Sequence, residues 1–183
     1  MIAVFLGINR LIYGDWQNRF RDDRIYWEQR TIRLRSDPMT VWQALRPDPA
    51  HPARHYWPGT SFMPVPKGED ADFLMVRPTR SGLKDETLLV SLEDQSPGQA
   101  LAIITRPLNP NDAETPVVRM DIRLGALSNG GTELKMRETI SRVTWGQRFE
   151  WWLSNDVADH MASMRARIDG GFDGSIHGSQ MVA

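Results

Sequence analysis

The 183-residue chain contains no cysteine. Disulfides, thiolate metal sites and cysteine nucleophiles are therefore excluded together. The absence of cysteine also fits a reducing compartment, and we predict a cytoplasmic protein.

Histidine, on which a zinc site would then depend, is scarce: the chain has His51, His55, His160 and His177. His51 and His55 are four residues apart, but Pro52 between them argues against a helix, and the glutamate of a zinc-protease motif is missing. The chain also lacks a glycine-flanked nucleophilic serine and a glycine-rich phosphate loop. We predict no metal and no cofactor.

Neither sign of charge predominates, because 22 lysines and arginines face 23 aspartates and glutamates, interspersed along the chain. This balance disfavours nucleic acid and acidic lipid as partners. Long apolar runs are missing too: the first is broken at Asn9 and Arg10 and lacks the basic start and cleavage site of a signal peptide. We expect neither a membrane-spanning segment nor a signal peptide.

Tryptophan and methionine are abundant, with seven and nine residues. They could line a large, adaptable apolar cavity or simply fill an ordinary core, and composition leaves both open. The length suits one domain with extensions. We predict a ligand-binding domain over 25–170, an amphipathic helix over 1–24 and a flexible, glycine-rich tail over 171–183.

The N-terminal segment places Phe5, Leu6, Trp16 and Phe20 on one helical arc. We expect this arc to dock on the domain, on a second copy in a homodimer, or on a partner protein. Peripheral contact with a membrane is the alternative, since these aromatic residues suit an interface. The mixture of acids and bases on the polar face argues against that alternative.

Alternating apolar residues predict a series of antiparallel strands. The predicted ranges are 25–35, 61–65, 72–77, 86–93, 99–106, 117–124 and 132–142. After the first strand, Asp37 and Pro38 predict the start of a short helix that ends by Arg46. The proline-bounded loop that follows carries Tyr56 and Trp57, and is either the entrance of a pocket or a packed connector.

A long amphipathic helix is predicted over 147–168, where apolar residues recur every three or four positions. Its apolar face consists of Phe149, Leu153, Val157, His160, Met161, Met164 and Ile168. The strands offer the only large apolar surface against which this face could be buried. We therefore predict an α+β fold in which a curved antiparallel sheet wraps around the C-terminal helix.

This order of elements resembles the START-like, or SRPBCC, superfamily of polyketide cyclases and lipid-transport proteins. Three stretches carry the resemblance: the strand leading into Ser36-Asp37-Pro38-Met39-Thr40-Val41-Trp42, followed by Trp57-Pro58-Gly59; the turn Asn129-Gly130-Gly131-Thr132-Glu133-Leu134; and the helix from Gln147. It implies a helix-grip fold with an elongated apolar cavity that binds lipid-, hormone- or polyketide-like molecules. It carries over no catalytic residue, because the superfamily has no universal catalytic set.

Candidate ligand-binding residues follow from the predicted strand and helix faces. They are Glu28, Arg30, Tyr56, Trp57, Met120, Met136, Glu138, Leu153, Val157, His160 and Met164. Three of them are charged, Glu28, Arg30 and Glu138, and they would meet if the first strand paired with the last. Such a cluster would either lock the sheet or orient the polar head of a ligand.

His160 and Asp156, one helical turn apart, are the catalytic candidates. The carboxylate could hold one imidazole nitrogen and leave the other facing a cavity, although a helix-edge ion pair or a satisfied core histidine would look the same. We predict binding of a small hydrophobic or amphipathic molecule. A cyclase or dehydratase that uses His160 with Asp156 or a pocket carboxylate, and a protein-interaction module, are the alternatives.

Overall fold

A computed structural model of the chain describes residues 21–22, 24–78, 85–109, 116–141, 143–144, 148 and 156–171. The predicted N-terminal helix up to residue 20, Phe149 and Leu153 of the predicted C-terminal helix, and the tail after residue 171 lie outside these ranges. The division of the chain into three parts stays a prediction.

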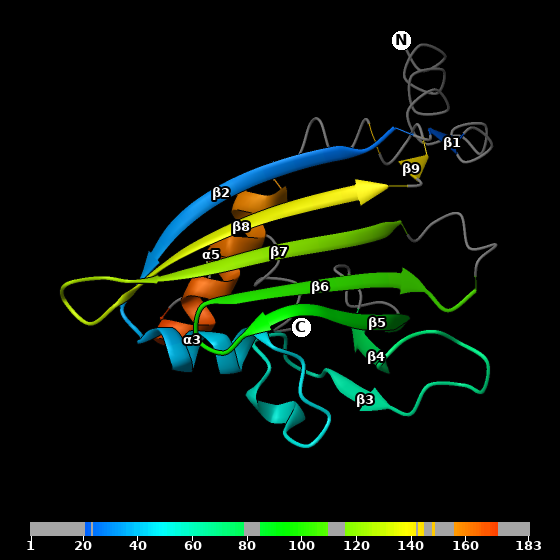
Figure 1. Cartoon of the computed structure of the whole chain (residues 1–183), viewed down its shortest axis with the longest axis horizontal. Coiled ribbons are helices and arrows are strands. Elements are labelled where there is room, and N and C mark those ends of the chain that lie inside the picture. Colours follow the sequence, from blue (N-terminus) through cyan, green and yellow to red (C-terminus); the bar gives the residue numbers. More distant parts are fainter. Residues whose placement is uncertain are drawn as a thin grey trace, which may run out of the picture.

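A curved sheet of seven antiparallel strands is the main layer of the protein (Figure 1). Its strands are β2 (Tyr26–Leu34), β3 (Ser61–Met63), β4 (Phe73–Pro78), β5 (Asp85–Ser96), β6 (Ala100–Pro107), β7 (Val117–Ala126) and β8 (Thr132–Ser141). The spatial order is β2-β8-β7-β6-β5-β4-β3, so every strand from β3 to β8 neighbours the next in sequence. The exception is β2, which pairs with the last strand, β8.

A second, two-stranded sheet joins β1 (Arg21–Asp22) to β9 (Val143–Thr144). The sequence pattern predicted an amphipathic helix over 1–24, but the structure has a strand at Arg21–Asp22, where the end of that helix was expected.

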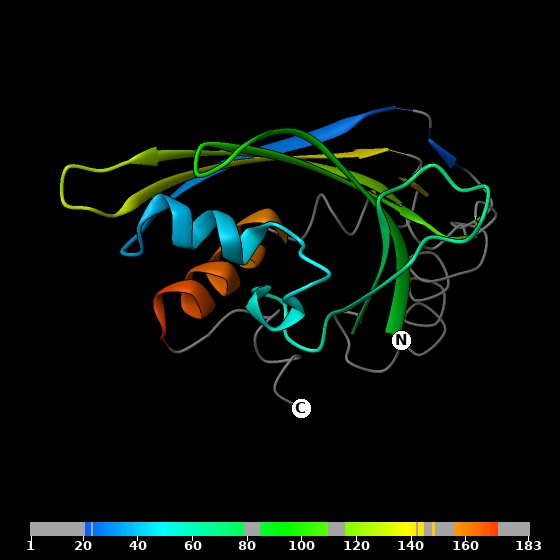
Figure 2. The same ribbon diagram turned by 60° about the horizontal axis from the view of Figure 1, so that its bottom comes forward.

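The helices α3 (Pro38–Leu45) and α5 (Asp156–Asp169) and the 3₁₀ turn η1 (Pro52–Arg54) lie on one face of the large sheet (Figure 2). As predicted, α3 begins at a cap, because the Asp37 carboxylate accepts from the backbone N–H groups of Met39 and Thr40. Arg46 is extended and precedes a proline, which ends the helix. None of the helices within the described ranges is both long and apolar enough to span a membrane.

The core lies between the inner face of the sheet and the two helices. Its members on α5 include Val157, Met161 and Met164, all 0% exposed, and they pack in one cluster with alternate residues of the strands. Burying each such side chain contributes about 1.5–3 kcal/mol relative to leaving it in water. The predicted α+β fold, a curved sheet wrapped around the C-terminal helix, is confirmed.

The turn between β7 and β8 needs glycine because it passes close to the end of β2. Gly130 has a positive φ of 84°, which favours glycine. A Cβ at Gly131 would collide with the backbone oxygen of Leu34. Next to it, the Thr132 hydroxyl donates to the carbonyl of Ser36 over 2.7 Å. The glycine pair therefore lets the hairpin approach the link between β2 and α3.

The C-terminal end of α5 is fastened to the same link. The Asp169 carboxylate accepts hydrogen bonds from the backbone N–H groups of Arg35 and Ser36 and from the Ser36 hydroxyl, at 2.9–3.1 Å. Burial alone would raise the pKa of Asp169, but these hydrogen bonds outweigh it and lower the pKa. One carboxylate thus fixes the helix against the segment that joins the first strand to α3.

We predict that Asp169→Asn lowers the free energy of unfolding by about 1–3 kcal/mol, because the amide loses the charge and one acceptor oxygen. Urea unfolding followed by circular dichroism measures the change. Asp70→Asn, at an exposed aspartate, is the matched control and should shift stability by less than about 0.5 kcal/mol. Equal stability of the two variants would contradict the proposed role of Asp169.

Candidate functional site

Four side chains from three separate parts of the chain meet on the inner face of the sheet. Tyr56 and Trp57 come from the loop after η1, Glu138 from β8 and His160 from α5. Tyr56, Trp57 and His160 are 7%, 4% and 8% exposed. Both side chains of the aromatic loop are therefore buried, and the choice between a pocket entrance and a packed connector stays a prediction.

His160 has a polar group at each ring nitrogen. The Tyr56 hydroxyl lies 2.7 Å from Nε2, and Oε2 of Glu138 lies 3.9 Å from Nδ1. The first distance is a hydrogen bond, whereas the second is a charge contact too long for one. With the proton on Nδ1, facing Glu138, Nε2 accepts from Tyr56. The imidazole thus joins the aromatic loop to β8.

Among the side chains that the structure describes, Glu138 from the sheet places a carboxylate beside the imidazole. The sequence pattern offered Asp156, one turn earlier on the helix, and its side chain lies outside the part that the structure describes. Sequence reasoning also left one imidazole nitrogen open, but Nε2 is bonded to Tyr56. The spacing of residues along a helix could not reveal a partner that lies 104 positions away.

Burial raises the pKa of the Tyr56 hydroxyl well above its ordinary value. Arg77 lowers it and Glu138 raises it by smaller amounts. The hydroxyl therefore stays protonated across the physiological range and acts as a hydrogen-bond donor. A buried donor, an imidazole and a carboxylate therefore lie together between the sheet and α5.

Arg77 of β4 positions the tryptophan next to this group. Its guanidinium lies over the Trp57 ring, 4.4 Å from the centroid, and its Nε donates to Glu86 of β5 over 2.5 Å. The Trp57 ring in turn meets the His160 ring edge-on, with centroids 5.5 Å apart. Sequence reasoning missed Arg77 and Glu86. Arg77 continues the inward alternation of Phe73 and Met75. This alternation in the sequence could have predicted that Arg77 faces inward.

The predicted pairing of the first strand with the last places Glu28, Arg30 and Glu138 on one face. Glu28 is directly opposite Glu138 in register. The Arg30 Nε donates to Oε1 of Glu28 over 2.6 Å. The Arg30 side chain is 49% exposed and that of Glu138 only 14%, so the ion pair is accessible to water while Glu138 lies deeper with His160.

The apolar candidates Met120, Met136, Val157 and Met164 all belong to the core cluster. Leu153 lies outside the described ranges. Their contact with a ligand stays a prediction. Within the described ranges, no group of three or more histidines, aspartates and glutamates could hold a metal ion.

His55 adjoins this site and is held neutral. Its ring lies 4.7 Å from that of Tyr56, and its Nδ1 accepts from the backbone N–H of Trp57 over 3.2 Å. Burial, with a smaller contribution from Arg77, lowers the pKa of His55 to about 4. Between pH 6.5 and 4 the unfolded chain therefore binds a proton here that the folded protein excludes.

We predict that stability falls as pH falls from 6.5 to 4, by on the order of 2 kcal/mol from this group alone. His55→Asn keeps an acceptor for the Trp57 N–H but cannot be protonated, so its unfolding free energy should depend less on pH in that window. The control is His51→Asn, whose parent side chain is 50% exposed. Urea unfolding at half-unit pH steps is the measurement, and parallel curves for wild type and His55→Asn would refute the assignment.

No protein-family model matches the chain, and no curated protein matches it in sequence. Solved structures do match it. Ara h 8.0201 has a TM-score of 0.57 at 13% identity, over 80% of this chain and 97% of its own. Protein MLL2253 from Mesorhizobium loti has a TM-score of 0.52 at 16% identity, over 80% of this chain and 94% of its own.

DynU16, a putative protein of the dynemicin biosynthetic locus, also has a TM-score of 0.52 at 16% identity, over 87% of this chain but 51% of its own. Ara h 8.0201 and DynU16 are START-like. Likeness at such low identity establishes the fold and leaves the chemistry open. The sequence resemblance is confirmed at that level: the chain has the START-like, or SRPBCC, helix-grip fold.

Proposed function

We propose that the protein binds a small hydrophobic or amphipathic molecule between the inner face of the sheet and α5. The polar end of the molecule would lie at Tyr56, Glu138 and His160. The observation that carries the proposal is this group of mostly buried polar side chains beside the apolar core cluster. The START-like fold of Ara h 8.0201 and DynU16 supports the binding of a hydrophobic ligand in general.

The spacing at His160 indicates which polar group the ligand would carry. Glu138 and the imidazole Nδ1 are 3.9 Å apart, too far for a direct hydrogen bond. A ligand hydroxyl between them could donate to the carboxylate and accept from the imidazole N–H. The apolar body would then lie along Met120 and Met136, whose unbranched side chains adapt to irregular shapes.

Acid–base catalysis on the bound molecule is a second candidate function. The Tyr56–His160 hydrogen bond favours it, because a protonated phenol and an imidazole within 2.7 Å can exchange a proton. A cyclisation or dehydration needs an acid and a base in contact with the substrate, and His160 would be the group that contacts it. Docking on a partner or a second copy through residues 1–24, as well as a cytoplasmic location, stay predictions.

Native mass spectrometry and solvent extraction of the purified protein test for a co-purifying apolar molecule. Two matched probes then test the polar end: 1-naphthol and 1-methylnaphthalene, which differ by a hydroxyl in place of a methyl group. We predict that Glu138→Gln weakens 1-naphthol binding about 5- to 20-fold, by loss of a charged acceptor, and leaves 1-methylnaphthalene within about twofold.

Glu133→Gln is the matched control, since Glu133 lies on the same strand with its side chain on the opposite face. Equal weakening for both probes would argue against a hydroxyl site at Glu138. If neither probe binds and nothing co-purifies, the binding function itself is wrong. For the catalytic candidate, His160→Gln should abolish conversion of an extracted molecule while changing 1-naphthol affinity by less than about tenfold.

A further inference from the structure

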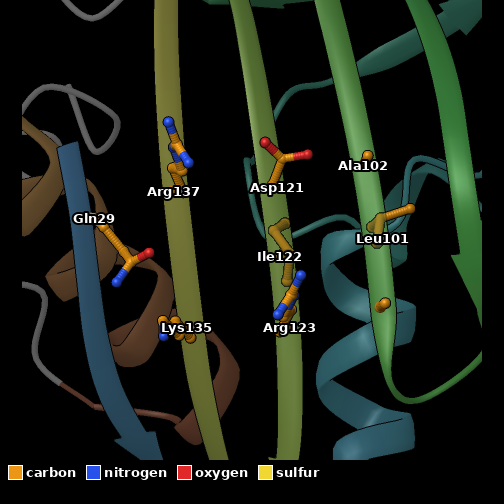
Figure 3. Close-up of a pocket in the computed structure, with 9 residues that line it drawn as sticks. Gln29, Leu101, Ala102, Asp121, Ile122, Arg123, Lys135 and Arg137 are labelled. Carbon is orange, nitrogen blue, oxygen red and sulfur yellow. The ribbon is translucent and has the colours of Figure 1, made fainter. Parts of the chain in front are cut away.

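A hollow of about 490 Å³ lies on the outer face of the sheet (Figure 3). Its lining comes from four adjacent strands: Gln29 of β2, Ala100, Leu101 and Ala102 of β6, Asp121, Ile122 and Arg123 of β7, and Lys135 and Arg137 of β8. Leu101 and Ile122 belong to the core cluster, so they contribute backbone here. The hollow is thus on the other face from Tyr56 and His160.

Two alanines create the hollow. Ala100 is opposite Arg123 in the register of β6 with β7, and Ala102 is opposite Asp121. Alternate residues of a strand share a face, so the two small side chains form a low floor beside the longer side chains of β7 and β8. The volume falls within the range of small-molecule sites.

The walls carry a concentration of positive charge. Arg123 and Lys135 are directly opposite each other in register, and Arg137 follows Lys135 on the same face, about 6–7 Å along the strand. Like charges directly opposite destabilise a sheet. A bound anion would relieve that repulsion.

The acids on this face do not neutralise the opposed pair. The Asp121 carboxylate accepts from Arg119 over 2.9 Å, and Arg119 also donates to Glu93 over 2.6 Å. Among the described residues, no carboxylate lies within ion-pair distance of Arg123 or Lys135, and both are exposed.

Arg137 makes a cation–π contact with Trp27: its guanidinium lies 4.6 Å from the centroid of the indole ring, which belongs to a residue that is 56% exposed. This contact leaves the guanidinium N–H groups able to donate.

We propose that this outer hollow binds a phosphoryl group, presented as a phosphate monoester. A phosphoryl dianion offers three acceptor oxygens, one for each of Arg123, Lys135 and Arg137, whereas a carboxylate offers two. Guanidinium groups match the geometry of phosphate oxygens, and the Gln29 amide can add a neutral donor. The group could belong to a soluble molecule or to a lipid headgroup, and the chemistry of recognition is the same.

Inorganic phosphate is the first probe, titrated at constant ionic strength and followed by ¹H–¹⁵N NMR. We expect saturable shifts at Gln29, Arg123, Lys135 and Arg137 and at the Trp27 indole N–H, which Trp27→Phe assigns. The double variant Arg123→Gln/Lys135→Gln should bind at least about tenfold more weakly. Arg33→Gln removes an exposed cation from the same face outside the hollow and should stay within about twofold.

Vesicles distinguish the two sources. The site belongs to a lipid headgroup if two results hold. The protein sediments with phosphatidylcholine vesicles that contain phosphatidic acid, but not with phosphatidylcholine alone. Arg123→Gln/Lys135→Gln abolishes this sedimentation. Phosphate binding without vesicle binding assigns the site to a soluble molecule. Two results would overturn the proposal, each in the absence of vesicle binding. One is phosphate-induced shifts that do not saturate. The other is shifts that are equal in wild type and the double variant.

Thermal unfolding measures whether each variant is folded. Because the substitutions remove an unfavourable pair, the double variant without phosphate should melt at or above the wild-type temperature at low salt. Added sodium chloride should raise the melting temperature of wild type more than that of the variant, since salt screens the repulsion. If the double variant fails to fold, Lys135→Gln alone serves the titration.

Discussion

The pairing of β2 with β8 is the constraint on which the rest of the structure depends. It spans nine residue pairs, from Tyr26 opposite Ile140 to Leu34 opposite Thr132, and so joins the first strand of the sheet to its last. The link after β2 then meets both the β7–β8 turn and the end of α5. Without this pairing, Glu28 would not face Glu138, and the C-terminal helix would lose its anchor at Asp169.

The order of strands and helices was predictable because each element has a pattern of apolar residues within its own short stretch of sequence. Period-two alternation identified the strands, Asp37 and Pro38 marked a helix start, and three- and four-residue spacing identified α5. The partners of His160 were harder to predict, because Tyr56 and Glu138 reach it from distant parts of the chain. The sequence did not predict the cluster of Arg123, Lys135 and Arg137, because these residues lie on two strands in a chain of balanced charge. Only the register of β7 with β8 places them side by side.

Alternate residues of β8 face opposite sides of the sheet, so this strand contributes cations to one face and mainly apolar side chains to the other. Lys135 and Arg137 face outward to the basic hollow, while Met136 and Glu138 face inward to the core and His160. A shift of one residue in register would exchange the two sets, burying the cations and exposing the apolar residues. The same core packing that stabilises the sheet therefore also keeps the two faces chemically distinct.

The pairing of β2 with β8 also sets the order in which the sheet is completed during synthesis. β2 emerges early, yet its partner follows about a hundred residues later, so its hydrogen-bonding edge and the exposed Trp27 wait unpaired while β3 to β7 are made. Long-range pairings of this kind slow folding, because distant segments must be brought together first. At the ribosome, the group around His160 can assemble only after α5 has emerged, and until β8 is made the first strand keeps an exposed edge of the kind that promotes aggregation.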